Sequence, residues 1–358
     1  MTNAVSSNQV KFLASSLGFD ACGIVPVNGG ETSFLKEDSD RLKQWVTQGF
    51  HGTMKYLEDF ESRAKKFWKN FPEAKSIIVV GVNYYSQEAS QEKSEKRKMQ
   101  NYGAAARRIN CPEGTPKFFT LHSPFSALEK QKPPTGRVAR YAWGKDYHRV
   151  IGKRLEEFRD KLSGFAGRAI RAEVCVDTKP LLERSLAQRA GLGFIGKQSQ
   201  LLSPKFGPWL FLGELVTDLE LEPDIPYVGS CGSCRICIDE CPTEAIQETG
   251  GIDARRCIAY LTIEHKGEIS ESLRPLVGDR VFGCDICLQV CPYASKGKET
   301  HWQELKPESG QGPFLNLLEL LEISSNRSYE RKFSGTAITR ASRKQLFRNA
   351  QIVLPRGF

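Results

Sequence analysis

The spacing of eight cysteines constrains this chain more than any other feature of its sequence. A first run, C-x2-C-x2-C-x3-C followed by proline, consists of Cys231, Cys234, Cys237 and Cys241. A shorter run, C-x2-C-x3-C followed by proline, consists of Cys284, Cys287 and Cys291. Runs of this kind hold [4Fe–4S] clusters through thiolates, and in proteins with two clusters the last cysteine of a run ligates the other cluster.

We therefore predict two [4Fe–4S] clusters. The predicted ligands of the first cluster are Cys231, Cys234, Cys237 and Cys291. The predicted ligands of the second cluster are Cys241, Cys257, Cys284 and Cys287. Cys257 stands alone between the two runs and would supply the ligand that the shorter run lacks.

The two alternatives are structural zinc and disulfide bonds. Zinc sites use paired C-x2-C knuckles and give no reason for the third and fourth cysteines of the first run. Disulfides require an oxidising compartment, and nothing in the sequence directs export. Cys22, Cys111 and Cys175 lie outside the pattern, and we expect them to be small apolar residues of the core.

Composition is that of an ordinary globular protein, with 40% hydrophobic and 26% charged residues among 358. We expect no membrane span, because no apolar stretch approaches the length that a bilayer requires. The N-terminal region lacks the features of a signal peptide or a twin-arginine pair, so a cytoplasmic location is expected. The net charge of +9 suits a polyanionic partner such as nucleic acid, although solubility alone would also explain it.

The fold class expected from the sequence is α+β, with three regions. Residues 1–220 form an α/β domain interrupted by a polar insertion at about 86–130, residues 221–300 contain the cysteines, and residues 301–358 form a helical, basic segment. Strands are predicted at 76–85, at the start of 171–202 and at 209–221. Helices are predicted before Gly191 and over 314–324.

Two segments carry further chemical signals. Asp177 follows a predicted strand, where it could act as a general acid or could simply cap the next helix. The stretch RYAWGKDYHRVI (140–151) mixes aromatic and basic residues, which suits contacts with a large cofactor or nucleic acid, but also the basic start of a helix. The G-x-G-x-x-G spacing at 191–196 follows a helix rather than a strand, so it is not interpreted as a dinucleotide site.

Several segments together resemble the epoxyqueuosine reductase family, whose members use cobalamin and iron–sulfur clusters to finish queuosine in tRNA. The segments are RYAWGKDYH, VDTKPLLERSLAQRAGLGFIGKQSQLL, FGPWLFLGEL, CGSCRICIDECPTEAI, RRCIAYLTIEHKGEI and FGCDICLQVCP. They run in the family's order and, with the C-terminal tail, span most of residues 10–350. VDTxPLLER with YLTIEHKG is the most specific combination.

The resemblance implies a mechanism and its residues. The clusters would reduce cob(II)alamin to cob(I)alamin, which would act on the epoxide, with Asp177 as proton donor. Cobalamin would lie between the α/β domain and the ferredoxin-like domain. Its implied contacts are Arg63, Arg140, Asp177, Leu201, Ala259, Lys266, Cys284 and Asp285. The assignment of Arg63 is the weakest of these, because its spacing to Pro72 is about one residue longer than the family's.

The resemblance also implies partners. The tail FSGTAITRASRKQLFRNA would contact phosphates of tRNA carrying epoxyqueuosine at the wobble position. The implied contacts are Arg340, Arg343, Lys344 and Arg348. A reduced flavodoxin or ferredoxin would donate electrons to a monomeric enzyme. The chain departs from the family in its longer insertion at 86–130 and in lacking the helical repeats that some members append after the tail.

Two other functions were weighed against this one. A corrinoid reductive dehalogenase would combine a similar domain with two clusters, but it would have no use for a basic tail. A non-catalytic electron-transfer or corrinoid-reactivating protein would explain the clusters, but it would leave Asp177 and the tail without a task.

Overall fold

The computed structural model describes residues 5–27, 35–88 and 133–354. The chain divides into two units, one formed by residues 1–86 with 134–358 and the other by residues 87–133. Nearly all of the second unit lies outside the described residues, as do most of the predicted insertion at 86–130 and Cys111. All helices and strands named below belong to the first unit.

The main sheet has four strands in the order β1 (Ala21–Pro26), β2 (Ser76–Asn83), β7 (Leu210–Thr217) and β4 (Ala172–Cys175). All three pairings are antiparallel. Every residue of β2 is buried, because this apolar run lies inside the sheet with helices over both of its faces. Strands β2, β7 and β4 lie where the sequence predicted strands, at 76–85, at 209–221 and at the start of 171–202.

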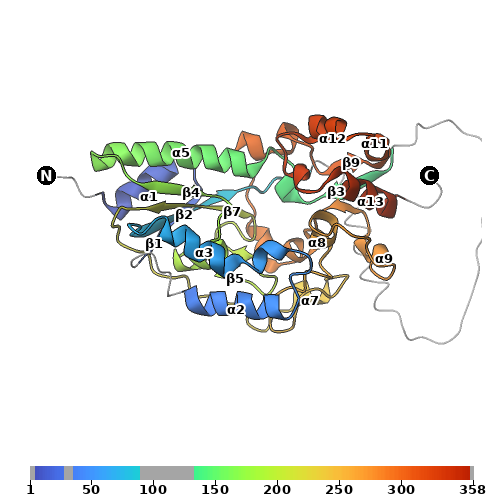
Figure 1. The fold of residues 1–358 in the computed structure, drawn as a ribbon, viewed down its shortest axis with the longest axis horizontal. Helices are drawn as coiled ribbons and strands as arrows, with labels where there is room; N and C mark the ends of the chain where they lie inside the picture. The colour runs from blue at the N-terminus through green and yellow to red at the C-terminus, as the bar shows by residue number, and fades with distance from the viewer. Residues whose placement is uncertain (1–4, 28–34, 89–132, 355–358) are drawn as a thin grey trace, which may run out of the picture. The chain divides into compact units, whose positions relative to one another are not determined.

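Different helices cover the two faces of this sheet (Figure 1). Helices α1 (Ser7–Ser16) and α5 (Tyr147–Ala166) pack on one face and share a core with apolar side chains of β2 and β7. Helix α6 (Glu183–Arg189) packs on the other face, together with the end of α3 (Phe60–Lys69). Helix α2 (Lys36–Thr47) is drawn on the same side of the sheet as α3 in Figure 1.

A second, three-stranded sheet has the order β8, β3, β9. Strand β3 (Thr135–Val138) pairs in parallel with β8 (Arg280–Phe282) and antiparallel with β9 (Phe314–Asn316). This sheet thus takes one strand from each of the three regions expected from the sequence, and the boundaries expected at 220 and 300 stay predictions. Strands β5 (Phe194–Ile195) and β6 (Leu201–Leu202) form a separate hairpin.

Apart from strands β8 and β9, the regular elements of the cysteine region and the C-terminal segment are short helices. Those of the cysteine region are α7 (Ile236–Asp239), α8 (Ile258–Ile263), α9 (Arg274–Val277) and α10 (Ile286–Gln289). Those of the C-terminal segment are α11 (Leu317–Glu322), α12 (Asn326–Phe333), the 3-10 helix η7 (Ala337–Arg340) and α13 (Arg343–Val353). The remaining 3-10 helices are η2 (Lys55–Leu57), η3 (Arg140–Ala142), η4 (Pro292–Lys296), η5 (Gln303–Leu305) and η6 (Pro307–Ser309).

Helix and strand content confirm the expected α+β class. The helix predicted over 314–324 is correct only in part, because residues 314–316 pair with β3 and helix α11 begins at Leu317. Gly191 follows the end of α6 with a φ of 80°, a conformation that glycine adopts without a steric cost, so its predicted role as a helix stop is confirmed. None of the described helices is both long and apolar enough to cross a membrane.

Candidate active site around Asp177

Asp177 lies in the loop that joins β4 to α6. Its φ is +56°, a left-handed backbone conformation that is uncommon outside glycine and is enriched at functional positions. It does not cap the next helix, since α6 begins at Glu183 and its N-cap residue is Leu182. The helix-capping alternative for Asp177 is therefore wrong.

Three side chains converge on one oxygen of the Asp177 carboxyl group. Tyr147 donates its hydroxyl to Oδ2 at 2.8 Å, and Arg340 donates Nη1 to the same oxygen at 2.5 Å. Nε2 of His148 lies 3.3 Å from Oδ2. Arg340 ends η7, whereas Tyr147 and His148 begin α5, so distant parts of the chain meet at this carboxyl.

The start of α5 fixes the orientation of these groups. Asp146 caps the helix by accepting a hydrogen bond from the backbone N–H of His148 at 3.1 Å, and the same oxygen lies 2.7 Å from Nδ1 of the imidazole. The ring of Tyr147 stacks on Phe211 of β7, with 4.3 Å between centroids and 7° between planes. Asp146, Tyr147 and His148, which belong to the aromatic and basic stretch 140–151, therefore form the polar wall opposite Asp177.

These contacts set the charges of the site. Burial would by itself raise the pKa of Asp177, but the hydrogen bond with His148 and the charge of Arg340 hold the pKa well below its ordinary value. Burial would lower the pKa of His148, but its hydrogen bonds to Asp146 and Asp177 raise the pKa to about 9. At neutral pH the site thus contains a carboxylate, a guanidinium and a protonated imidazole.

Two further carboxyl groups lie behind Asp177. Glu183 accepts a hydrogen bond from the backbone N–H of Asp177, with 2.5 Å between N and Oε1. Burial raises the pKa of Glu183 to about 7, and the Asp177 carboxylate adds to that rise. Glu214, in the middle of β7, is completely buried, and burial raises its pKa well above the ordinary value.

Other predicted contact residues surround the same space. Burial raises the pKa of Tyr141. The charge of Arg340 lowers this pKa, whereas the charges of Asp177, Asp285 and Glu264 raise it, so these four side chains lie near the Tyr141 hydroxyl. Arg63 donates from Nη1 to the carbonyl oxygen of Tyr56 at 3.3 Å and from Nη2 to that of Thr178, beside Asp177, at 3.5 Å. The structure therefore brings Arg63, Asp177 and Asp285 around one site.

Arg140 is buried in an aromatic cage. Its guanidinium carbon lies 4.7 Å from the ring centroid of Tyr85, 4.8 Å from that of Trp143 and 4.6 Å from that of Trp209. Its backbone N–H donates to Oδ2 of Asp285 at 2.6 Å. This bond ties the 3-10 helix η3 to the segment between Cys284 and Cys287.

The remaining predicted cofactor contacts lie at different depths. Leu201 is buried in β6 and packs in the same cluster as Leu181 of the Asp177 loop. Ala259 is half-buried in α8, whereas Lys266 is exposed beyond that helix. The side-chain amide of Gln198 and Nε of Arg140 are buried and have no hydrogen-bond partner among the described residues.

The structure brings the predicted ligands of the first cluster together. Burial raises the pKa of Cys237, and the neighbouring thiols of Cys231, Cys291 and Cys234 raise it further. Cys231 and Cys234 likewise raise the pKa of Cys291, although Cys291 belongs to the other run. The backbone N–H of Lys197 points at Sγ of Cys231, with a distance of 3.4 Å.

The predicted ligands of the second cluster form a separate group. Burial raises the pKa of Cys287 well above its ordinary value, and Cys284, Cys257 and Cys241 raise it further. Burial likewise raises the pKa of Cys284 to about 12, and Cys257 contributes to this rise. The ten described cysteines are all free thiols. The assignment of each thiolate to one cluster stays a prediction.

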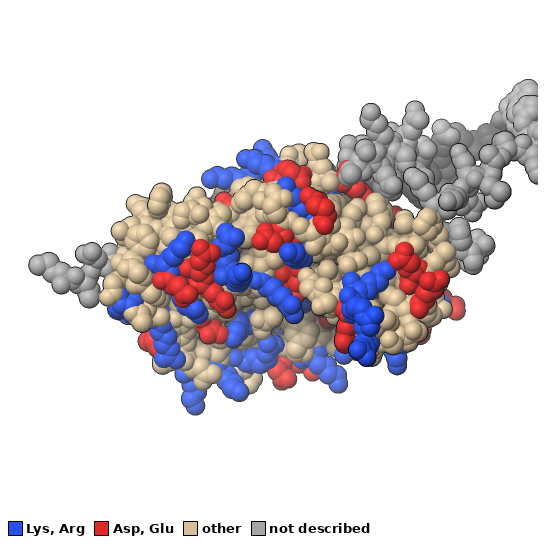
Figure 2. Space-filling model, turned by 90° about the horizontal axis from the view of Figure 1, so that it is seen from above, with Lys and Arg blue, Asp and Glu red and all other residues tan. Residues whose placement is uncertain are grey.

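The basic residues of the C-terminal segment do not share one role. Arg340 is bound to Asp177, and Arg343 donates to the carbonyl oxygen of Ile323 at 3.0 Å. Lys344 is exposed. On the face in Figure 2, the described Lys and Arg side chains are interspersed with Asp and Glu rather than gathered into one basic patch.

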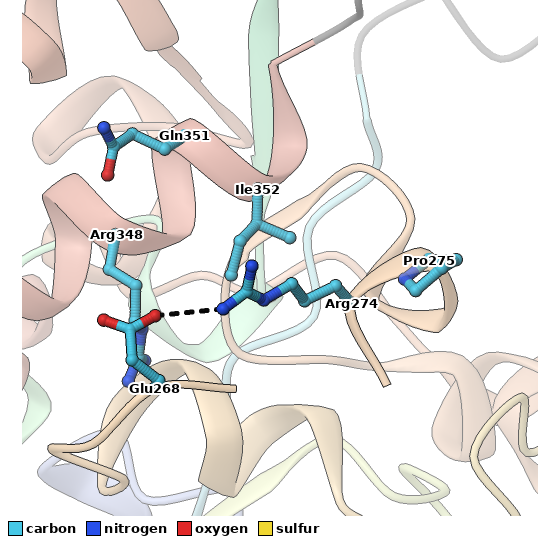
Figure 3. Close-up of a pocket in the computed structure, with 6 residues that line it drawn as sticks. All are labelled: Glu268, Arg274, Pro275, Arg348, Gln351 and Ile352. Carbon is cyan, nitrogen blue, oxygen red and sulfur yellow. Dashed lines mark hydrogen bonds and ion pairs between the residues drawn. The ribbon is translucent and has the colours of Figure 1, made fainter. Parts of the chain in front are cut away.

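Arg348 does not lie where a phosphate contact was expected. Its side chain is buried and donates from Nη1 to the carbonyl oxygen of His265 at 2.8 Å and from Nη2 to that of Leu261 at 2.6 Å. It forms part of the wall of a cavity of about 440 Å³, in which Arg274 is paired with Glu268 (Figure 3). These bonds join α13 to the end of α8, which is a structural role.

Sequence reasoning did not assign Tyr147, His148, Glu183 and Glu214 to the site. Tyr147 and His148 belonged to a stretch whose chemistry was noted, but their contact with Asp177 depends on the packing of α5 beside the β4–α6 loop. A signal for Glu214 is present in the sequence, because an acidic residue stands in the middle of an apolar strand, LFLGELVT. Such a residue is expected only where it has a partner or a function.

Comparison with known proteins identifies relatives over nearly the whole chain. Residues 230–294 match the family model "4Fe-4S double cluster binding domain", and residues 119–178 match "Epoxyqueuosine reductase QueG, DUF1730". The epoxyqueuosine reductase of Xanthomonas campestris pv. campestris is 32% identical over 97% of this chain and 85% of its own length. That of Synechocystis sp. is 33% identical over 92% of this chain and 98% of its own.

Solved structures agree with these matches. A crystal structure of epoxyqueuosine reductase with a tRNA-Tyr epoxyqueuosine-modified stem loop is 31% identical, with a TM-score of 0.73 over 97% of this chain and 80% of that one. A structure of the Bacillus subtilis enzyme, described with its aspartate-bearing catalytic loop swung out of the active site, is 30% identical, with the same TM-score and coverage.

Proposed function

The chain belongs to the epoxyqueuosine reductase family of oxidoreductases, and from this premise we propose that it reduces epoxyqueuosine in tRNA to queuosine. The reaction removes the epoxide oxygen as water and leaves an alkene, which consumes two electrons and two protons. The observation that carries the proposal is the Asp177 site, where a carboxyl group at a strand end meets the hydrogen-bond donors Tyr147, His148 and Arg340.

Electrons would enter through two [4Fe–4S] clusters held by the two cysteine groups described above. The match of residues 230–294 to a double-cluster domain supports this assignment. Formation of the clusters would displace the thiol protons, since thiolates are the ligands. An external reduced flavodoxin or ferredoxin would be the donor to a monomeric enzyme.

Cobalamin is the proposed second cofactor, and when bound and reduced it would supply a strongly reducing and nucleophilic metal centre that acts on the epoxide. The unpartnered side-chain amide of Gln198 suits a cofactor that is rich in amide groups. Arg63 and Asp285 line the same space, Leu201 offers an apolar contact next to the Asp177 loop, and Ala259 and Lys266 extend the site from α8.

Asp177 would deliver a proton to the oxygen that leaves the epoxide carbon. In the described arrangement the hydrogen bond with His148 and the charge of Arg340 keep this carboxyl ionised. A substrate that displaces the guanidinium would remove that charge and raise the pKa of Asp177, and protonated His148 stands 3.3 Å away to supply the proton. The aspartate-bearing catalytic loop named for the Bacillus subtilis relative supports a catalytic role for Asp177.

The released Arg340 would then be available to a tRNA phosphate, together with Lys344 and Arg343. Phosphate contacts of this kind orient the nucleic acid without reading its sequence. The relative crystallised with a modified tRNA stem loop supports tRNA as the substrate.

The proposal can be tested by product analysis. The protein would be loaded anaerobically with iron, sulfide and cobalamin, supplied with a strong reductant and incubated with tRNA that carries epoxyqueuosine. Mass spectrometry of the digested nucleosides should show the loss of one oxygen, and omission of either cobalamin or reductant should abolish this loss. An unchanged nucleoside from fully loaded protein would contradict the proposal.

A further inference from the structure

Glu214 occupies an unusual place for an acidic residue. It lies in the central strand β7, opposite Val79 of β2 and Cys175 of β4. Side chains of these two neighbours belong to the apolar cluster that packs under α6. No part of the Glu214 side chain is exposed, and its two carboxyl oxygens have no hydrogen-bond partner at ordinary geometry among the described residues.

A buried carboxyl group without partners is stable only in its neutral form, because an isolated charge in an apolar layer loses its hydration without compensation. Glu214 therefore holds a proton at neutral pH. The neighbouring carboxyl of Glu183 raises the pKa of Glu214 beyond the effect of burial. A protonated carboxyl can be buried as a neutral group behind Glu183.

Glu183 connects this acid to the catalytic loop. Its Oε1 accepts the backbone N–H of Asp177 at 2.5 Å, at the residue whose φ is +56°. Since a left-handed conformation is unfavourable for a residue with a side chain, surrounding contacts must hold Asp177 in it. Arg63 and Glu173 also anchor this loop, but they bind Thr178 and Lys179, which follow Asp177.

We infer that Glu183 is a positioning residue for Asp177. The bond from Glu183 fixes the peptide of Asp177, so that the carboxyl group faces Tyr147, His148 and Arg340. Glu214 lies buried behind Glu183 as a neutral group. Without the bond from Glu183 the loop would lose a contact that holds the left-handed residue.

Ionisation of Glu183 would adjust the strength of this bond. The charged groups that face it are Asp177, Arg184 and His148, with neutral Glu214 below. Its pKa of about 7 means that the carboxylate, which accepts the peptide hydrogen more strongly, forms as the pH rises through neutrality. An inflection near pH 7 in the plot of turnover rate against pH should therefore depend on Glu183.

The first test measures the loop directly and needs no substrate. Hydrogen–deuterium exchange would be followed for peptides covering residues 174–182 in cluster-loaded protein under anaerobic conditions. Glu183→Ala should increase the exchange rate at Asp177 at least about tenfold. Glu183→Gln should stay close to wild type, because its amide oxygen can still accept the bond. Unchanged exchange in Glu183→Ala would overturn the inference.

The matched control is Glu173→Gln. Glu173 is also an acidic residue that anchors this loop, but it binds Lys179 rather than Asp177. Exchange at Asp177 in this variant should remain within about twofold of wild type. An increase as large as that of Glu183→Ala would assign the effect to general loosening of the loop and would overturn the specific role of Glu183.

The second test follows turnover against pH, and it rests on the proposed function. Wild type should show an inflection near pH 7, and Glu183→Gln, which folds with nearly the same shape, should lack it. An identical inflection in both proteins would contradict the inference, even if Glu183→Ala does not fold. Wild-type protein that never converts epoxyqueuosine would refute the proposed function instead, while the exchange result would still decide the role of Glu183.

Discussion

Arg340 and Asp177 are 163 positions apart in the sequence, yet Nη1 of the arginine lies 2.5 Å from Oδ2 of the aspartate. Both side chains are about one third exposed, at 34% and 38%. The pair therefore sits at the mouth of the site, where a substrate can reach it. It joins the segment expected to bind tRNA to the residue expected to deliver the proton.

Replacement of Arg340 should change the pH range of catalysis. Arg340→Gln removes the cation beside Asp177, so the pKa of Asp177 should rise, by about 1–3 units for the loss of a close opposite charge. The pH at which kcat/KM falls on the alkaline side, which reports the free enzyme in which Arg340 still pairs with Asp177, should move upward in the variant. Lys332→Gln, which removes a charge paired with Glu319 elsewhere in the same segment, is the control and should leave the profile unchanged. An identical profile for Arg340→Gln would separate Arg340 from the ionisation of Asp177.

His148 should make stability depend on pH above neutrality. Because its folded-state pKa is raised to about 9 from 6.5, the protonated form stabilises the fold fully below pH 6.5, and this contribution is lost as the pH rises through about 9. The loss amounts to about 3 kcal/mol at most. Thermal unfolding of loaded protein should therefore show a falling midpoint across this range, and His148→Gln should flatten the fall. Equal slopes in both proteins would contradict the contacts assigned to His148.

Cys257 is the most informative cysteine to replace, because it belongs to neither run. Cys257→Ser should disturb only the second cluster, and the iron content should fall from about eight to about four per chain. Cys22→Ala, outside both cysteine groups, should keep about eight. Full iron content in Cys257→Ser would show that the ligand set is different.

Lys344 and Arg348 should respond differently, although both come from the same basic tail. Lys344→Ala should weaken tRNA binding and reduce its salt dependence by about one phosphate contact, with unchanged stability. Arg348→Ala leaves buried carbonyl groups without donors and should lower the free energy of unfolding by at least about 2 kcal/mol. Binding titrations against salt, together with thermal unfolding, separate the two effects. Equal behaviour of the two variants would contradict the buried role of Arg348.

The cysteine ligands could be predicted because cluster binding is encoded in local spacing. Strands β2 and β7 could be predicted because their apolar runs are long, as befits strands that are buried throughout in β2 and over most of β7. Short elements were less predictable: Phe314–Asn316 is a strand only because β3 lies beside it, and no local pattern carries that information.

The site was predictable only in part, for the same physical reason. Asp177 was found through a motif, but its partners arrive from α5 and η7 through tertiary packing. The burial of Arg348 also depends on the fold, since the sequence around it shows only basic residues. Glu214 is the exception, because an acidic residue within an apolar strand is a local signal of a buried polar function.

The most direct measurement compares wild type and Asp177→Asn in a single-turnover reaction with epoxyqueuosine tRNA. Both proteins would first be matched for iron and cobalamin content, so that only the carboxyl group differs. Loss of a positioned proton donor should slow the appearance of the deoxygenated nucleoside by about a hundredfold to ten-thousandfold. A rate in Asp177→Asn equal to that of wild type would contradict the central role assigned to this residue.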